Sequence, residues 1–144
     1  MRRGHLIAIG LLGVGSWLVM PAAHASEATV KATMSGADEV PGPGDPDGKG
    51  TATIVLDDAK NTACYELTYE NLGEVTAAHV HAGAPKVAGP PAIDFKIRTN
   101  GNKGCVNVDP ATAKAIRDNP ANYYVNIHTT DYGNGAIRGQ LAKG

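Results

Sequence analysis

The chain has 144 residues, with 13 lysine and arginine side chains against 14 aspartate and glutamate side chains, and a formal net charge of −1 at pH 7. This length suits one domain with one core. The balanced charge excludes a strongly basic footprint, so we expect no nucleic acid partner.

The first 25 residues predict a secretory signal peptide. Arg2 and Arg3 give a basic start, residues 6–20 are apolar and uncharged, and Ala23 and Ala25 place small residues at the −3 and −1 positions. The apolar run is shorter than the roughly 20 residues of a membrane-spanning helix. We therefore expect cleavage after Ala25, export to the periplasm or the extracellular space, and a mature chain without a membrane anchor.

After this signal, residues 26–34 lead into one domain that spans 35–144. Short segments with β-type patterning alternate with turn residues, and segment 93–98 has the clearest period of two. Segment 41–50, rich in proline, glycine and aspartate, predicts a loop. Strands are expected at 28–35, 51–56, 64–69, 76–81, 93–98, 105–108, 123–129 and 136–141.

One helix interrupts the strands near residues 110–118. Asp109 can cap its N-terminus, Pro110 fits its first turn, and Asn119 followed by Pro120 ends it. About eight short antiparallel strands with one short helix predict an all-β fold, either a sandwich or a barrel.

Cys64 and Cys105 are the cysteines of the chain. Export would place them in an oxidising compartment, where disulfides persist, and two cysteines allow a single intramolecular pairing. The alternative is a pair of free buried thiols. The compartment favours the disulfide.

Three histidines fall inside the expected strands. His79 and His81 are two residues apart, so they point to one face of their strand, while Ala78 and Val80 form its apolar face. The same alternation places His128 on the side opposite to the apolar residues of segment 123–129. All three histidines are therefore expected on the outer face of the sheet.

Two further polar side chains share this expected outer face. Asn126 lies two residues before His128, and Arg138 follows in the next strand. If the last two strands form a hairpin across the Gly-rich turn at 133–135, His128 and Arg138 become neighbours. Arg138 and Asn126 are therefore candidates for contacting an anion or for supporting the histidines.

Spacing alone does not bring His128 to His79 and His81, because that requires adjacent strands. If the strands are adjacent, three imidazoles converge, and three histidines with an open position can bind copper or, as a second choice, zinc. The alternative is that the histidines form structural hydrogen bonds to loops such as 83–91.

Seven segments appear in the order found in chordin-type (CHRD) domains and cover roughly residues 35–142. They are SGADEVP (35–41), GTATIVLD (50–57), ACYELTYENL (63–72), TAAHVHAG (76–83), GCVNVDP (104–110), NPANYYVNIHT (119–129) and GAIRGQL (135–141). The chain thus resembles the CHRD family. The resemblance implies an extracellular Greek-key, immunoglobulin-like sandwich, and the two cysteines resemble those of cysteine-bearing members.

A more distant likeness is to copper/zinc superoxide dismutases. By that likeness His79, His81 and His128 match three copper ligands, and Arg138 matches the active-site arginine. The bridging and zinc-loop histidines of the enzyme have no counterpart, since 83–91 contains no histidine. The likeness implies a superoxide-dismutase-like fold and copper binding, but not dismutation.

Two functions remain open from sequence. The first is a secreted binding or structural module whose ligand is an unidentified extracellular protein or small molecule. The alternative is a copper-preferring domain with a three-histidine site and a weak redox role. The chain has no G-x-S-x-G motif, and its cysteines are expected to be oxidised, so catalysis by a serine or cysteine nucleophile is not expected.

Overall fold

The computed structural model describes residues 26–144, and the expected signal peptide lies outside them. Alternating buried and exposed side chains mark most of its strands. The elements are β1 (Glu27–Ser35), η1 (Gly36–Asp38), β2 (Lys49–Asp57), β3 (Thr62–Glu70), β4 (Val75–Ala82), β5 (Pro91–Asp94), α1 (Ile97–Asn100), β6 (Lys103–Asn107), α2 (Pro110–Asp118), η2 (Pro120–Asn122), β7 (Tyr123–Thr129), β8 (Ile137–Gln140) and β9 (Ala142–Lys143).

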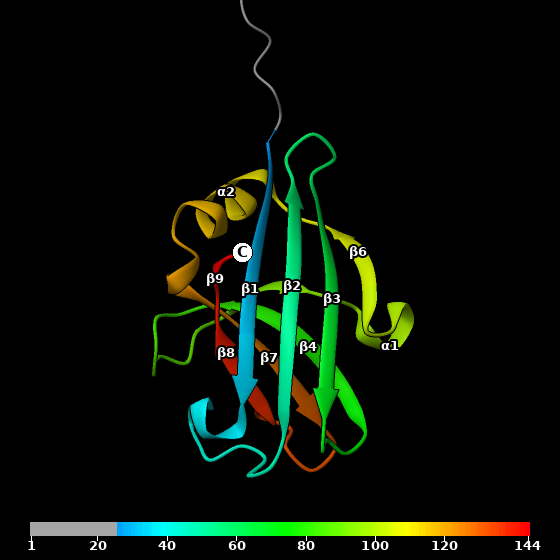
Figure 1. The fold of residues 1–144 in the computed structure, drawn as a ribbon, viewed down its shortest axis with the longest axis vertical. Coiled ribbons are helices and arrows are strands. Elements are labelled where there is room, and N and C mark those ends of the chain that lie inside the picture. Colours follow the sequence, from blue (N-terminus) through cyan, green and yellow to red (C-terminus); the bar gives the residue numbers. More distant parts are fainter. Residues whose placement is uncertain (1–25) are drawn as a thin grey trace, which may run out of the picture.

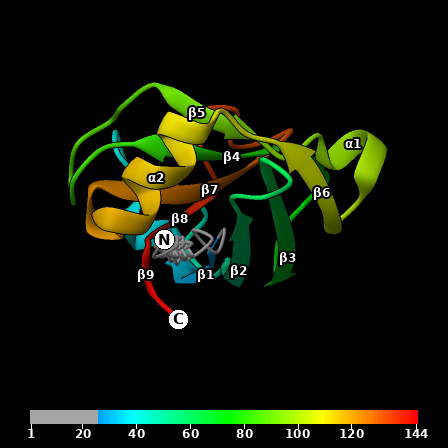
Figure 2. The ribbon, with the colours of Figure 1, turned by 90° about the horizontal axis from the view of Figure 1, so that it is seen from above.

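The strands form one nearly closed antiparallel sheet in the order β5-β4-β7-β8-β1-β2-β3-β6, with β9 beside β1. Strands β1, β2 and β3 form one layer, and β4, β7 and β8 cross behind it (Figures 1 and 2). The edge strands β5 and β6 face each other across a pocket that both of them line. The predicted all-β fold is confirmed, with nine strands among residues 26–144 instead of about eight.

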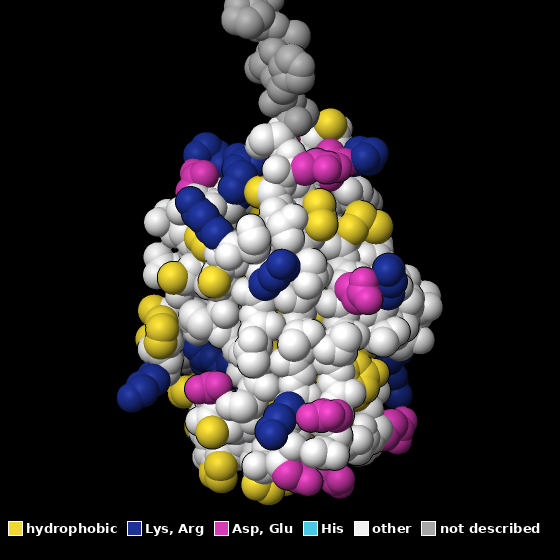
Figure 3. All heavy atoms as spheres, viewed as in Figure 1, with side chains coloured by type: hydrophobic (Ala, Val, Ile, Leu, Met, Phe, Trp, Pro, Cys, Tyr) yellow, Lys and Arg dark blue, Asp and Glu magenta, His cyan; other side chains and the backbone are white. Residues whose placement is uncertain are grey.

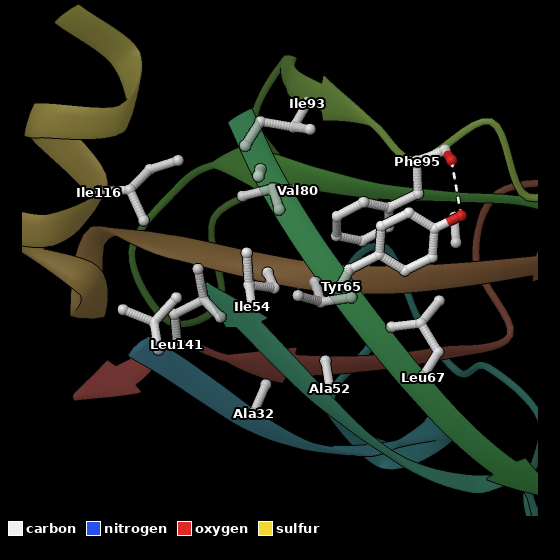
Figure 4. Close-up of a cluster of buried hydrophobic side chains, with 14 of the residues drawn as sticks. Ala32, Ala52, Ile54, Tyr65, Leu67, Val80, Ile93, Phe95, Ile116 and Leu141 are labelled. Atoms are coloured by element: carbon white, nitrogen blue, oxygen red, sulfur yellow. Dashed lines mark hydrogen bonds between the residues drawn. The ribbon is translucent and has the colours of Figure 1, made fainter. Parts of the chain in front are cut away.

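The core fills the space between the two layers. Tyr65 of β3 stacks on Phe95 with ring centroids 4.4 Å apart, and its hydroxyl donates a 2.8 Å hydrogen bond to the Phe95 carbonyl (Figure 4). Ile116 points into the core from α2, which closes one end of the sheet (Figures 1 and 4). The described residues therefore share one apolar core across both layers.

Helix α2 lies where the sequence predicts it. The Asp109 carboxylate accepts the backbone N–H of Thr112, which satisfies one of the free donors of the first turn. Pro110 occupies the first turn, and the helix ends at Asp118 before Asn119. The predicted span 110–118 is confirmed.

The predicted strand at 93–98 is only partly right. β5 ends at Asp94, because its carboxylate accepts the Lys96 N–H at 2.8 Å and Lys96 adopts a left-handed backbone with φ of 55°. The chain then enters α1. Ile93, Phe95 and Ile97 are nevertheless buried, so the alternation identified the core-facing side chains correctly but not the backbone.

The predicted disulfide is present. Cys64 and Cys105 are directly opposite each other in the β3–β6 ladder and are bonded through their sulfurs. Since β6 is an edge strand of the sheet, the bond fastens this edge to its neighbour.

Replacing both cysteines, as Cys64→Ala with Cys105→Ala, should lower the free energy of unfolding by about 3–4 kcal/mol. The bond closes a loop with a sequence separation of 41, and its loss restores conformational freedom to the unfolded chain. Urea denaturation measures this effect. A double variant as stable as the wild type would contradict it, and reduction of the wild type should reproduce the loss.

Glu39 is an unusual charged residue because it is buried directly after η1. Only 6% of it is exposed, and a side chain on Gly135 would collide with its carboxyl group. Burial raises the pKa of Glu39 from 4.5 to about 7, since the charged form loses its hydration. The folded protein therefore keeps this carboxyl protonated in a range where the unfolded chain ionises it.

Stability should consequently fall as pH rises from about 4.5 to about 7, because the folded state binds more protons there than the unfolded state. The Glu39 contribution to this slope is about 3 kcal/mol over the whole window. Glu39→Gln should remove it in urea melts at several pH values. Asp38→Asn, an exposed neighbour, should keep most of the slope, and equal slopes in the Gln variant and wild type would refute the assignment.

Candidate metal centre

The pairing of β4 with β7 brings the three histidines together. These strands are antiparallel neighbours, with His79 opposite Asn126, His81 opposite Tyr124, and Ala77 opposite His128. Residue spacing alone left this adjacency open, whereas the resemblance implied that the three histidines cluster. Figure 3 shows the β1–β3 layer, whose surface carries interspersed side chains of both charges. The histidines belong to the other layer, in β4 and β7.

The imidazole rings lie close enough to share one ion. His79 Nδ1 is 3.2 Å from His128 Nε2, and one nitrogen from each of the three rings lies within 4.8 Å of the others. Two nitrogens bound to one ion at about 2.0–2.1 Å lie at most about 4.2 Å apart. The widest nitrogen separation of up to 4.8 Å thus exceeds that limit by about 0.6 Å.

In two of the three imidazole rings, a hydrogen bond between Nδ1 and a backbone carbonyl sets the tautomer. His81 Nδ1 is 2.8 Å from the carbonyl of Gly89, and His128 Nδ1 is 3.0 Å from the carbonyl of Gly133. A carbonyl only accepts, so both Nδ1 atoms carry hydrogen and both Nε2 atoms keep a lone pair. His81 Nε2 is buried without any hydrogen-bond partner.

The third ring has an acidic neighbour on its far side. His79 Nε2 lies 4.0 Å from Asp94 Oδ1, and its Nδ1 faces His128. A carboxylate behind a ligating histidine favours the proton on the far nitrogen and leaves the near nitrogen free. In the metal-free protein, however, His128 Nε2 is the acceptor, so His79 Nδ1 is the donor of their 3.2 Å contact, and a bound metal would have to displace its proton.

Partial burial favours neutral imidazoles. Burial lowers the pKa of His79, and the neighbouring His128 lowers it further. Burial is also the main cause of the lowered pKa of His128. Neutral rings are the form that binds metal. A pocket of about 160 Å³ is lined by His79, Asp94 and Lys96, but not by His81 or His128.

The outer face is covered, which the sequence did not predict. Tyr124, Asn126 and Arg138 lie on that face but are 3%, 3% and 2% exposed. The segment 83–90 folds over Tyr124 and Arg138. Gly89 permits this close approach, since a Cβ there would lie 1.5 Å from the Ala82 carbonyl.

Asn126 contacts the histidine cluster directly, whereas Arg138 does not. The Asn126 amide lies 3.1 Å from His128 Nε2, so it contacts the histidines directly. Arg138 is opposite Asn126 in β8, but its guanidinium lies 3.4 Å above the Tyr124 ring. Tyr124 in turn stacks on His81 at 5.0 Å with nearly parallel planes. Arg138 therefore reaches the cluster only through Tyr124.

Alternation along β7 puts Tyr124 on the face of Asn126 and His128, but sequence reasoning gave it no role. The contact of His81 with the Gly89 carbonyl agrees with the alternative of structural hydrogen bonds to segment 83–91. Sequence reasoning missed Asp94, because its place beside His79 depends on strand pairing.

A CHRD domain family model matches residues 30–141. The chain belongs to the CHRD domain family. No curated protein and no solved structure matches the chain, so the likeness to superoxide dismutases stays a prediction. Within residues 26–144 of this CHRD domain, no helix is long and apolar enough to cross a bilayer.

Tyr124→Leu should destabilise this CHRD domain by about 3 kcal/mol, because it removes the contacts to His81 and Arg138. Tyr124→Phe keeps the stack and loses only the hydroxyl contact with Gly89, so about 1 kcal/mol is expected. Thermal and urea unfolding measure both. Tyr69→Leu, on an exposed site of β3, is the control, and an equal loss there would contradict the role of the stack.

Proposed function

We propose that this CHRD domain is a binding module for one copper ion, held by His79 Nδ1, His81 Nε2 and His128 Nε2. The observation that carries the proposal is the buried, unpartnered Nε2 of His81, next to two other imidazole nitrogens. A buried acceptor without a partner is costly, and an ion at this point would remove that cost.

Copper is the preferred ion because the donor set is made of neutral imidazoles. Divalent copper binds nitrogen ligands more tightly than zinc does, and imidazole suits both metals. Zinc is the second choice, since three histidines with an open fourth position also bind zinc. The CHRD family supports a binding or structural module, and copper would be the ligand of that module.

The structural alternative leaves one imidazole nitrogen unexplained. The hydrogen bonds of His81 and His128 to Gly89 and Gly133 use Nδ1 and fix the ring orientation. His128 Nε2 also has polar contacts, with His79 Nδ1 at 3.2 Å and with the Asn126 amide at 3.1 Å, whereas His81 Nε2 has no partner. A purely structural pair would need no third histidine beside them, whereas a metal site would need both the fixed orientation and the third nitrogen.

Export is part of this proposal. The basic, apolar and small-residue pattern of residues 1–25 favours a signal peptide, and the Cys64–Cys105 bond suits an oxidising compartment. We propose that the domain binds copper after export, in the periplasm or outside the cell.

Titration of the metal-free protein with Cu²⁺ should give one tight site per chain, with nitrogen hyperfine splitting in the electron paramagnetic resonance spectrum. His81→Ala should weaken binding by about 100-fold or more, since one of three ligands is lost. Asp94→Asn should weaken it by about tenfold, because the carboxylate only orients His79.

Export would remove His5 and His24 with the signal peptide, so the titration uses the mature chain, in which His79, His81 and His128 are the histidines. An affinity that survives removal of His79, His81 and His128 together would overturn the copper site and leave a binding module for another ligand.

A further inference from the structure

A second pocket lies on the other side of Arg138, towards β1. It has a volume of about 670 Å³ and is lined by η1 with the two residues after it, by Pro85 and Lys86 of the covering segment, and by Thr33, Arg138 and Gln140. None of the three histidines lines it. It is therefore separate from the candidate metal centre.

Arg138 enters this pocket with unused hydrogen-bonding capacity. Its Nη2 donates to the Ala84 carbonyl at 3.0 Å and to Gln140 Oε1 at 3.4 Å, and Tyr124 covers one face of the guanidinium. Its Nη1 is buried and has no partner. A buried guanidinium with a free donor is costly unless an acceptor reaches it.

Glu39 provides the opposite chemistry in the same pocket. Its Oε1 is also buried and also lacks a hydrogen-bond partner. The two residues attract each other electrostatically, yet these atoms do not bond to each other. The pocket thus holds one orphan donor and one orphan acceptor, each on a charged side chain.

We propose that this pocket binds a small zwitterion of the amino acid class, with its carboxylate accepting from Arg138 Nη1 and its ammonium group donating to Glu39 Oε1. Such a ligand satisfies both orphan atoms at once. A simple anion would be repelled by the carboxylates of Glu39 and Asp38, and a simple cation would be repelled by Arg138 and Lys86. This site does not depend on the metal.

The test is calorimetric titration of the metal-free full chain at pH 8, where Glu39 is mostly ionised. Glycine, β-alanine and 4-aminobutanoate serve as probes with increasing separation of charge, and acetate and methylammonium serve as half-ligands. At least one amino acid should bind saturably and about tenfold or more tighter than either half-ligand, because each lacks one charged hydrogen bond.

Glu39→Gln should weaken this binding about tenfold, whereas Asp38→Asn, an exposed carboxylate on the same pocket, should change it less than about twofold. Arg138→Lys keeps the charge but removes Nη1 and should also weaken binding. Circular dichroism checks that each variant is folded. If Arg138→Lys does not fold, the comparison of the Glu39 and Asp38 variants decides.

Proton release gives an independent readout. With its pKa about 7, Glu39 is about half protonated at pH 7, and an ammonium partner favours the ionised form, so binding should release about half a proton. Titration in buffers of different ionisation enthalpy measures this, and Glu39→Gln should abolish it. The proposal is overturned if no amino acid binds saturably, if acetate binds as tightly as the best of them, or if the Glu39 and Asp38 variants are weakened equally.

Discussion

The register between β4 and β7 is the constraint on which the candidate metal centre depends. It places His79 opposite Asn126 and His81 opposite Tyr124, and Asn126 is in turn opposite Arg138 of β8. Because side chains alternate with period two, a slip of β4 by one residue would turn His79 and His81 into the core. Ala78 and Val80 prevent that slip, since both would have to leave the core.

The covering segment 83–90 gives this face its chemistry. A polar row on an open sheet would be solvated, and its imidazoles and guanidinium would need no special partners. The carbonyls of Ala84 and Gly89 reach Arg138 and His81 from above and exclude water from them. The covering segment therefore helps to leave His81 Nε2 and Arg138 Nη1 buried without hydrogen-bond partners.

The sequence predicts most of the strands, and it also predicts which face of its strand each histidine occupies. Both depend on the local alternation of side chains. It fails at Lys96, whose backbone N–H donates to the Asp94 carboxylate and ends the strand against the apolar pattern. Local alternation also cannot predict that β4 pairs with β7, or where segment 83–90 runs, because both depend on contacts between residues distant in sequence. Glu39 shows the limit most clearly: nothing near it in sequence predicts burial, which arises from the distant Gly135 and Ala136 loop.

Arg138 connects the two sites physically. Its guanidinium, the Tyr124 ring and the His81 imidazole form one continuous stack, with Glu39 in the pocket beside the guanidinium. A buried charge stabilises a fold less than an apolar side chain of similar volume would, since its lost hydration offsets much of its attraction to neighbours. Stability alone therefore does not account for Arg138 and Glu39 in this position with atoms left unpaired. Recognition does account for them, because each unpaired atom becomes a specific contact once a ligand of opposite character enters.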